Sequence, residues 1–239
     1  MGHNRPTMTG SFERVADGIW HDTHDLSMTG GVQFRTRSTL VRLADGTLWM
    51  HSPIPIDDAR AAQIDALGEV AHIVAPNGFH DGYSAAAKSR YPNATLWGSK
   101  GLEAQKSKLQ VDRWLEQSAP WSDELPSLLI EGAPKGGEYV FFHPATRSLI
   151  VTDLLFQIRY PVNARTKLVL WMAGVNGGRL AQSKLWRALT KDRAAAGRSV
   201  KKMLEWDFER VILGHGDCVE GPDARERTRE ALWWMLDAA

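Results

Sequence analysis

Apolar and polar positions along the first third of the chain predict a hairpin followed by a helix and a strand. Residues 34–43 and 47–51 are rich in Leu, Val, Thr and aromatic residues, and the Asp45-Gly46 pair between them is typical of a hairpin turn. After Asp57, apolar residues recur at helical spacing until Gly68, a residue type that commonly ends helices. The short apolar run at 72–75 then predicts a strand.

Strands and helices continue to alternate to the end of the chain. A helix is predicted at 84–91 and strands at 95–97, 128–131, 139–142 and 148–152, the last two forming a second hairpin through a turn at 144–147. Further helices are predicted at 164–172 and 183–205, the second broken near Gly197. A strand is expected at 210–213, and a last helix from Pro222 with Asp223 as its cap.

Composition narrows the class of protein without naming a partner. Of 239 residues, 43% are hydrophobic and 24% charged, as in globular proteins, and no repeat or linker divides the chain. We therefore expect one domain over 12–239, preceded by a flexible segment at 1–11. A net charge of +1 gives no sign of a nucleic-acid partner. A single cysteine, no secretory signal and no apolar run of about 18 residues predict a cytoplasmic protein with no membrane partner.

Four predicted strands end in residues able to bind a metal or move a proton. These residues are His51, His80 with Asp81, Asp153 and His215. Functional groups gather at strand ends in sheets covered by helices, and imidazole with carboxylate suits zinc, iron or manganese. Each also fits a structural role taken alone, for example Asp153 as a cap and His215 as a packed loop histidine.

Three segments resemble the metallo-β-lactamase superfamily. They are Ile73-Val-Ala-Pro-Asn-Gly-Phe-His-Asp81, the hairpin at 139–156 with Leu149-Ile-Val-Thr-Asp153, and Val211-Ile-Leu-Gly-His-Gly216, in the order of that family's landmarks. Together with Leu-Trp-x-His-Ser-Pro at 48–53, they are most similar to a branch of unknown function. The resemblance implies an α/β fold of four layers, an αββα sandwich in which two mixed sheets are flanked by helices.

The resemblance also implies two metal positions, and this chain retains residues for one. The first position takes three histidines, but Pro76 and Gly78 stand where two of them belong and the loop at 132–137 offers none. The second position takes two histidines and two aspartates, and the resemblance assigns it to His80, Asp81, Asp153 and His215, with the first pair in swapped order. The expected cofactor is one zinc, iron or manganese ion, or no metal at all.

Two functions remain open from the sequence. In the first, a metal-activated water hydrolyses a small-molecule ester, amide or related substrate, with Asp81 or Asp153 accepting the proton and His51 as a further base. Asn77 and Lys135 are the candidate substrate-binding residues. In the second, the chain is an inactive relic of the fold that binds a small molecule or a protein.

Two surface features add candidate contacts. Arg35, Arg37 and Arg42 with Lys135 are candidate ligands of an anion, or solvated strand positions. The adjacent Trp233 and Trp234 mark a candidate contact of a homodimer, because neighbouring helical residues point in different directions.

Overall fold

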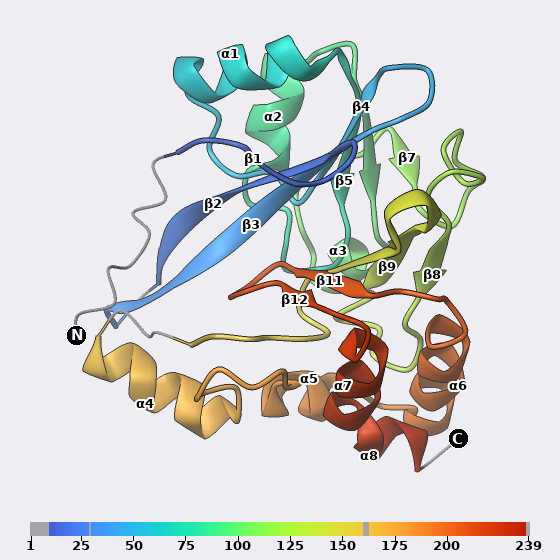
Figure 1. The fold of residues 1–239 in the computed structure, drawn as a ribbon. Helices are drawn as coiled ribbons and strands as arrows, with labels where there is room; N and C mark the ends of the chain where they lie inside the picture. Colours follow the sequence, from blue (N-terminus) through green and yellow to red (C-terminus); the bar gives the residue numbers. More distant parts are fainter. Residues whose placement is uncertain (1–9, 29, 160–162, 238–239) are drawn as a thin grey trace.

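The strands form two mixed β-sheets in a computed structural model that describes residues 10–28, 30–159 and 163–237 (Figure 1). In this part of the chain the first sheet has seven strands, paired in chain order: β1 (Glu13–Ala16), β2 (Ile19–Met28), β3 (Val32–Arg42), β4 (Leu48–His51), β5 (Val70–Ala75), β6 (Thr95–Gly98) and β7 (Arg113–Trp114). Neighbours from β1 to β4 are antiparallel, and those from β4 to β7 are parallel.

The second sheet has five strands over the same described ranges, in the order β12-β11-β10-β9-β8. They are β8 (Ser127–Leu129), β9 (Tyr139–His143), β10 (Ser148–Val151), β11 (Arg210–Leu213) and β12 (Val219–Glu220). Only the central pair, β10 and β11, is parallel among the pairs described. The carboxyl ends of β10 and β11, which are far apart in sequence, therefore lie side by side at the same end of this sheet.

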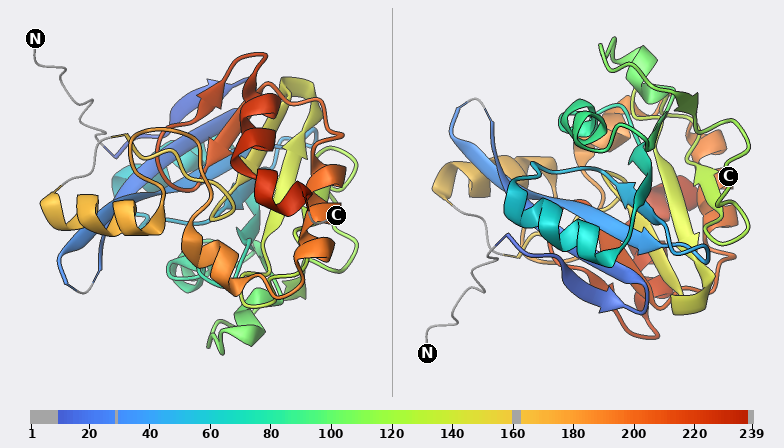
Figure 2. Two further views of the ribbon diagram at one scale, coloured as in Figure 1. Left: turned by 90° about the horizontal axis from the view of Figure 1, so that it is seen from below. Right: turned by 90° about the horizontal axis from the view of Figure 1, so that it is seen from above.

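Helices cover the outer side of each sheet (Figures 1 and 2). Near the first sheet lie α1 (Asp58–Leu67), α2 (Ser84–Arg90) and the single turn α3 (Gly101–Ala104). On the opposite side of the molecule lie α4 (Ala164–Ala173), α5 (Lys184–Leu189), α6 (Arg193–Met203), α7 (Ala224–Ala231) and α8 (Trp233–Leu236). Among the described residues, no helix combines the length and apolar character needed to cross a bilayer.

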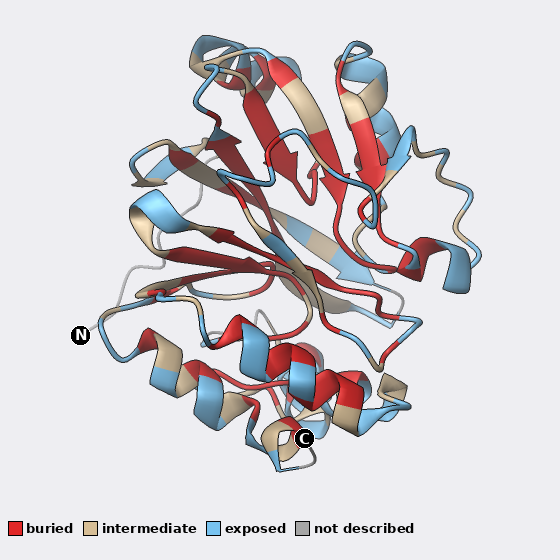
Figure 3. Ribbon diagram, turned by 90° about the vertical axis from the view of Figure 1, so that its right-hand side faces the viewer, coloured by how far each residue is buried: buried red, intermediate tan, exposed pale blue. Residues whose placement is uncertain are grey.

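Alternation of side chains along the strands builds the four layers. Trp49 of β4 and Phe141 of β9 point into one apolar cluster between the sheets. Their neighbour Met50 packs with α1 on the outer side of the first sheet, and Phe142 packs with α6 on the outer side of the second. Because successive residues of a strand face opposite sides, buried strands carry apolar residues on both faces. The strands in Figure 3 are accordingly mostly buried, whereas the helices carry exposed residues on their outward sides.

The predicted αββα sandwich of two mixed sheets is confirmed, with differences in detail. The break in the predicted helix at 183–205 lies between α5 and α6 and not near Gly197, because the Asp192 side chain accepts a hydrogen bond from the backbone of Ala195 and starts α6 there. Asp223 precedes α7 without a side-chain capping bond. Most of the predicted flexible segment at 1–11 lies outside the described residues, and the single domain stays a prediction.

Candidate metal site

Three of the predicted residues converge where strands of both sheets end. Asp153 follows β10 and His215 follows β11, whose parallel pairing brings their carboxyl ends together. His80 comes from the loop after β5, in the first sheet. One ligand atom from each of the three side chains lies within 4.8 Å of the others. The site is therefore built from both sheets.

The ring nitrogens and the carboxylate face one another at short range. The Nε2 atoms of His80 and His215 are 3.1 Å apart, and each lies 3.4 Å from a different carboxylate oxygen of Asp153. The three side chains are 4–16% exposed, so little water competes for these contacts.

The partner of its second ring nitrogen fixes how His215 presents Nε2. Its Nδ1 lies 2.7 Å from the backbone carbonyl of Arg35, which can only accept, so Nδ1 carries the hydrogen. In the neutral ring Nε2 then has a free lone pair directed at Asp153 and His80. The ring is stacked on Phe156 at a centroid distance of 5.4 Å and an interplanar angle of 4°. This orientation is the one a metal ligand needs.

Hydrogen bonds at its loop hold His80 in place. The side-chain carbonyl of Asn77 accepts from the backbone N–H groups of Phe79 and His80, which folds the loop into a tight turn. Ser52, directly after β4, lies with its hydroxyl 2.6 Å from His80 Nδ1. When the ring donates to Ser52, its Nε2 is also free to bind a cation.

A second layer of polar groups, including a glutamate that sequence reasoning missed, positions Asp153. The Asn77 amide donates to Asp153 Oδ2 at 2.9 Å and lies 3.4 Å from Glu138 Oε2. Glu138 is fully buried and accepts from the backbone N–H groups of Thr152 and Asp153, at 2.8 and 3.0 Å. Burial, and then the charge of Asp153, raise the pKa of Glu138 above its ordinary value.

Electrostatics keeps the aspartate ionised. Burial opposes the charge on Asp153, but His80 and His215 hold its pKa far below the ordinary range. Burial likewise opposes protonation of His80, yet Asp153 raises the pKa of this imidazole. Two imidazoles around one carboxylate, with Nε2 atoms aimed at a shared point, form a donor set that fits zinc, iron or manganese.

The remaining predicted site residues lie around this cluster and not in it. Asp81 accepts a hydrogen bond from Ser107 through Oδ2 and is not one of the three clustered residues. His51 is buried against Trp49 and Phe141, and burial lowers its pKa to about 3.

The two candidate substrate-binding residues differ in their surroundings. Lys135 is exposed, and its backbone carbonyl accepts a hydrogen bond from Gln105. Asn77 supports Asp153 and the His80 loop, as described above.

The predicted arginine set does not converge on an anion. Arg35 pairs with Asp25 at 2.9 Å, and Arg42 donates to the backbone carbonyl of Leu67. Arg37 is buried, contrary to a solvated strand position, and its guanidinium donates to the backbone carbonyls of Leu213 and Gly216. It therefore fastens the loop that carries His215 to β3 of the first sheet.

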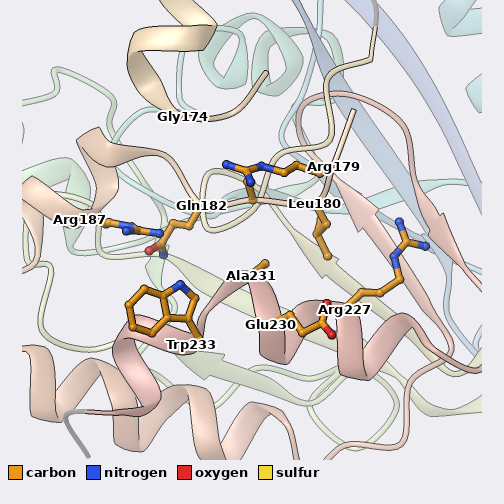
Figure 4. A pocket seen from close by; sticks show the side chains of 10 residues that line it. Gly174, Arg179, Leu180, Gln182, Arg187, Arg227, Glu230, Ala231 and Trp233 are labelled. Carbon is orange, nitrogen blue, oxygen red and sulfur yellow. The ribbon is translucent and has the colours of Figure 1, made fainter. Parts of the chain in front are cut away.

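Two hollows of different character open on this half of the molecule. The larger, about 550 Å³, has His80, Asp153 and His215 in its wall. The smaller, about 350 Å³, is lined by Arg179, Arg187, Arg227 and neighbours from α7 and α8 (Figure 4). Trp233 at its edge is 55% exposed, whereas the indole of Trp234 donates to Gln182. The homodimer suggested by this pair stays a prediction.

Several solved structures that are similar to this chain are metallo-β-lactamases. One from Pontibacter korlensis is 12% identical, with a TM-score of 0.64, over 93% of this chain and 98% of that chain. One from Hirschia baltica is 12% identical, with a TM-score of 0.62, over 94% and 97%. FIM-1 from Pseudomonas aeruginosa, in a mono-zinc form, is 14% identical, with a TM-score of 0.60, over 95% and 93%. The chain thus has the metallo-β-lactamase fold.

The sequence itself matches a narrower group. No curated protein gives a significant match. A family model described as a domain of unknown function, DUF4336, matches residues 17–171. That match covers well over half of the chain, and the chain therefore belongs to the DUF4336 family.

Proposed function

We propose that this chain is a metal-dependent hydrolase with a single ion held by His80, Asp153 and His215. The observation that carries the proposal is the convergence of three donor side chains, from two sheets, in the wall of a pocket large enough for a small molecule. Zinc, iron or manganese suits the donor set, and three protein ligands leave a coordination position for water. The substrate is a small molecule with an ester, amide or related bond.

Packing around Gly78, in the loop after β5, supports a site for one ion and not for two. Gly78 stands where the family resemblance puts a histidine of the first metal position. A Cβ atom at residue 78 would lie 2.5 Å from the carbonyl oxygen of Lys135 and 2.8 Å from that of Gly101. Backbone atoms on both sides therefore leave no room for a side chain, and the proposed site is mononuclear.

The residues of the site divide the work of hydrolysis. When bound, the ion would lower the pKa of its water to ~7 and polarise the bond to be cleaved. Asp153, the one carboxylate that lines the described pocket, accepts a hydrogen bond from the attacking water and orients it. Asn77 and Glu138 keep the carboxylate in place from behind.

Metal analysis tests the proposal directly. Protein purified without a chelating resin should contain about one equivalent of zinc, iron or manganese per chain by mass spectrometry. Asp153→Asn and His215→Ala should lose this metal, and the metal-loaded wild type should hydrolyse esters in a reaction that chelators stop. His143→Ala is the matched control, because that ring bonds Thr146 in a hairpin turn and lies outside the cluster.

Asp81→Asn separates the two versions of the ligand set. We expect this variant to keep its metal, because Asp81 is bonded to Ser107 and lies outside the three-residue cluster. Loss of the metal in Asp81→Asn would restore the four-ligand set expected from the sequence. A wild type without metal, whose melting temperature does not change when zinc, iron or manganese is added, would refute the hydrolase and favour an inactive relic of the fold.

A further inference from the structure

The larger pocket, here named the apolar channel, is lined mostly by apolar side chains and has His80, Asp153 and His215 in its wall. It measures about 550 Å³, within the roughly 300–1,000 Å³ typical of sites for small organic ligands. Its wall comes from β2 and β3 of the first sheet, the loops after β5 and β10, and the helices α4 and α5. The helix α4 is held against β3 by a hydrogen bond from the backbone of Gln33 to the hydroxyl of Thr166, at 2.9 Å. The channel is thus formed between one sheet and the helices of the opposite side.

Aromatic and aliphatic side chains continue the apolar surface up to the cluster. Phe156 is stacked on the ring of His215, and the edge of Phe34 meets the same ring at a centroid distance of 5.0 Å. Farther along the wall lie Ile158, Leu170 and Val175, which are at most 8% exposed. A ligand whose reactive group reaches His215 would therefore lie against hydrocarbon along the rest of its length.

Several apolar residues that line the pocket are also exposed to solvent. Four lining residues are more than a third exposed: Met28 (51%), Phe79 (45%), Val169 (36%) and Leu185 (63%). Large apolar side chains that are exposed together around one opening are typical of a ligand-binding or interaction surface. This rim extends the apolar channel to solvent, where a long hydrocarbon group would leave it.

No cation lines the described part of this pocket to hold an anionic ligand. Asp153 is its one charged lining residue apart from histidine, and Arg35, beside His215 in the fold, is turned to Asp25. Three arginines, Arg179, Arg187 and Arg227, line the smaller hollow instead, and Figure 4 shows them there. A carboxylate or phosphate placed in this pocket away from the three-residue cluster would be desolvated without a partner, which is strongly unfavourable.

We propose that the substrate is an uncharged ester or amide with a long apolar acyl group. The acyl chain lies in the channel and the bond to be cleaved lies over His80, Asp153 and His215. Water adds to the carbonyl carbon, the bond to the leaving oxygen or nitrogen breaks, and the proton from water passes to that leaving atom. Cleavage of this ester or amide rests on the proposed hydrolase function, whereas binding of the apolar chain does not.

Binding is tested first, without metal or turnover. An uncharged apolar fluorophore, N-phenyl-1-naphthylamine, is bound to the protein and displaced by straight-chain alkanols of about four to ten carbons. Each methylene buried in the channel should tighten binding about fourfold until the channel is full. Affinity that does not change with chain length would overturn the proposal.

Two exposed leucines provide a matched pair of variants. Leu185→Asp places a charge at the mouth and should weaken binding of the longer alkanols by roughly tenfold or more. Leu168→Asp is the control, because Leu168 is 55% exposed on α4 but does not line the pocket. Both positions are on the surface, so both variants should fold, which circular dichroism checks. Equal effects of the two substitutions would also overturn the proposal.

Turnover then separates this inference from the proposed function. Zinc-loaded protein is given p-nitrophenyl esters of the same chain lengths, and kcat/KM should rise with acyl length in parallel with alkanol affinity. Length-dependent binding without any hydrolysis would refute the hydrolase but support the apolar binding site. Hydrolysis at a rate independent of acyl length would support the hydrolase and overturn the proposed substrate class.

Discussion

Replacing the buried Glu138, which does not line the pocket, should lower the free energy of unfolding substantially. Glu138 is fully buried and its carboxylate accepts the backbone N–H groups of Thr152 and Asp153. Glu138→Ala removes both acceptors at once and leaves two buried donors without a partner. The same change frees the amide of Asn77, which otherwise lies between Glu138 and Asp153.

The expected loss follows from those two donors. A buried N–H left without an acceptor destabilises the folded state by about 1–3 kcal/mol, so two of them predict a loss of about 2–6 kcal/mol. Glu138→Gln keeps one carbonyl oxygen for one of the donors, and we expect about half of the effect. Domains of this size are stable by about 5–15 kcal/mol in total, so the alanine variant loses a large fraction of its stability.

Urea unfolding followed by circular dichroism measures this loss. The free energy of unfolding should fall in the order wild type, Glu138→Gln, Glu138→Ala, with an unchanged dependence on urea concentration. Glu131→Ala, at an exposed glutamate near the start of the same segment, should stay within about 0.5 kcal/mol of the wild type. A loss below about 1 kcal/mol for Glu138→Ala, or a larger loss for the glutamine variant, would show that the two backbone bonds are not what this residue provides.

Three further changes test other parts of the fold by the same unfolding assay. Gly216→Ala should destabilise the fold by about 1–3 kcal/mol or more, because φ is +90° and a Cβ would lie 2.2 Å from the Gln157 carbonyl oxygen. Gly82→Ala is the control, because a Cβ there meets no atom within 4 Å and should have little effect. Burial lowers the pKa of His51 to about 3 from 6.5, so unfolding takes up a proton between these values and stability falls as the pH drops below about 6.5. His51→Asn should remove about 2 kcal/mol of the loss between pH 6.5 and 4.5, and equal pH slopes in both proteins would contradict this origin. Trp121→Ala, in the core between the sheets, should lose about 3–5 kcal/mol, and a loss near zero would contradict the packing described.

The sequence contains enough local information to locate most strands and the three residues that cluster where the strands end. A strand of alternating or wholly apolar residues ends where a polar residue begins, and His80, Asp153 and His215 follow such ends. Parallel pairing of β10 with β11 then brings Asp153 and His215 together, and the metallo-β-lactamase fold supplies that pairing. What the sequence lacked was the orientation of Asp81, which depends on a bond to Ser107 in a distant loop.

Other features could not be predicted because their partners are far away in the chain. The strand β2 contains histidines and aspartates that interrupt an apolar pattern, and the buried Asp22 is paired there with Arg60 of α1 at 2.6 Å. Glu138 precedes an apolar strand without any motif, and its partners are two backbone N–H groups and the side-chain amide of Asn77. Arg37 was expected at a solvated position, because a charged residue in a strand usually faces water. Instead its guanidinium donates to the end of β11 and the loop after it, and so joins the two sheets.

Because the cluster is divided between the two sheets, its geometry depends on how the sheets are aligned with each other. His80 belongs to the first sheet, Asp153 and His215 to the second, and Arg37 is a polar strut between them near this point. A shear of one sheet past the other by an ångström would lengthen the His80 contacts while leaving the other pair intact. An ion seated there would act as a clamp against such sliding, and its release would be coupled to the relative movement of the two halves.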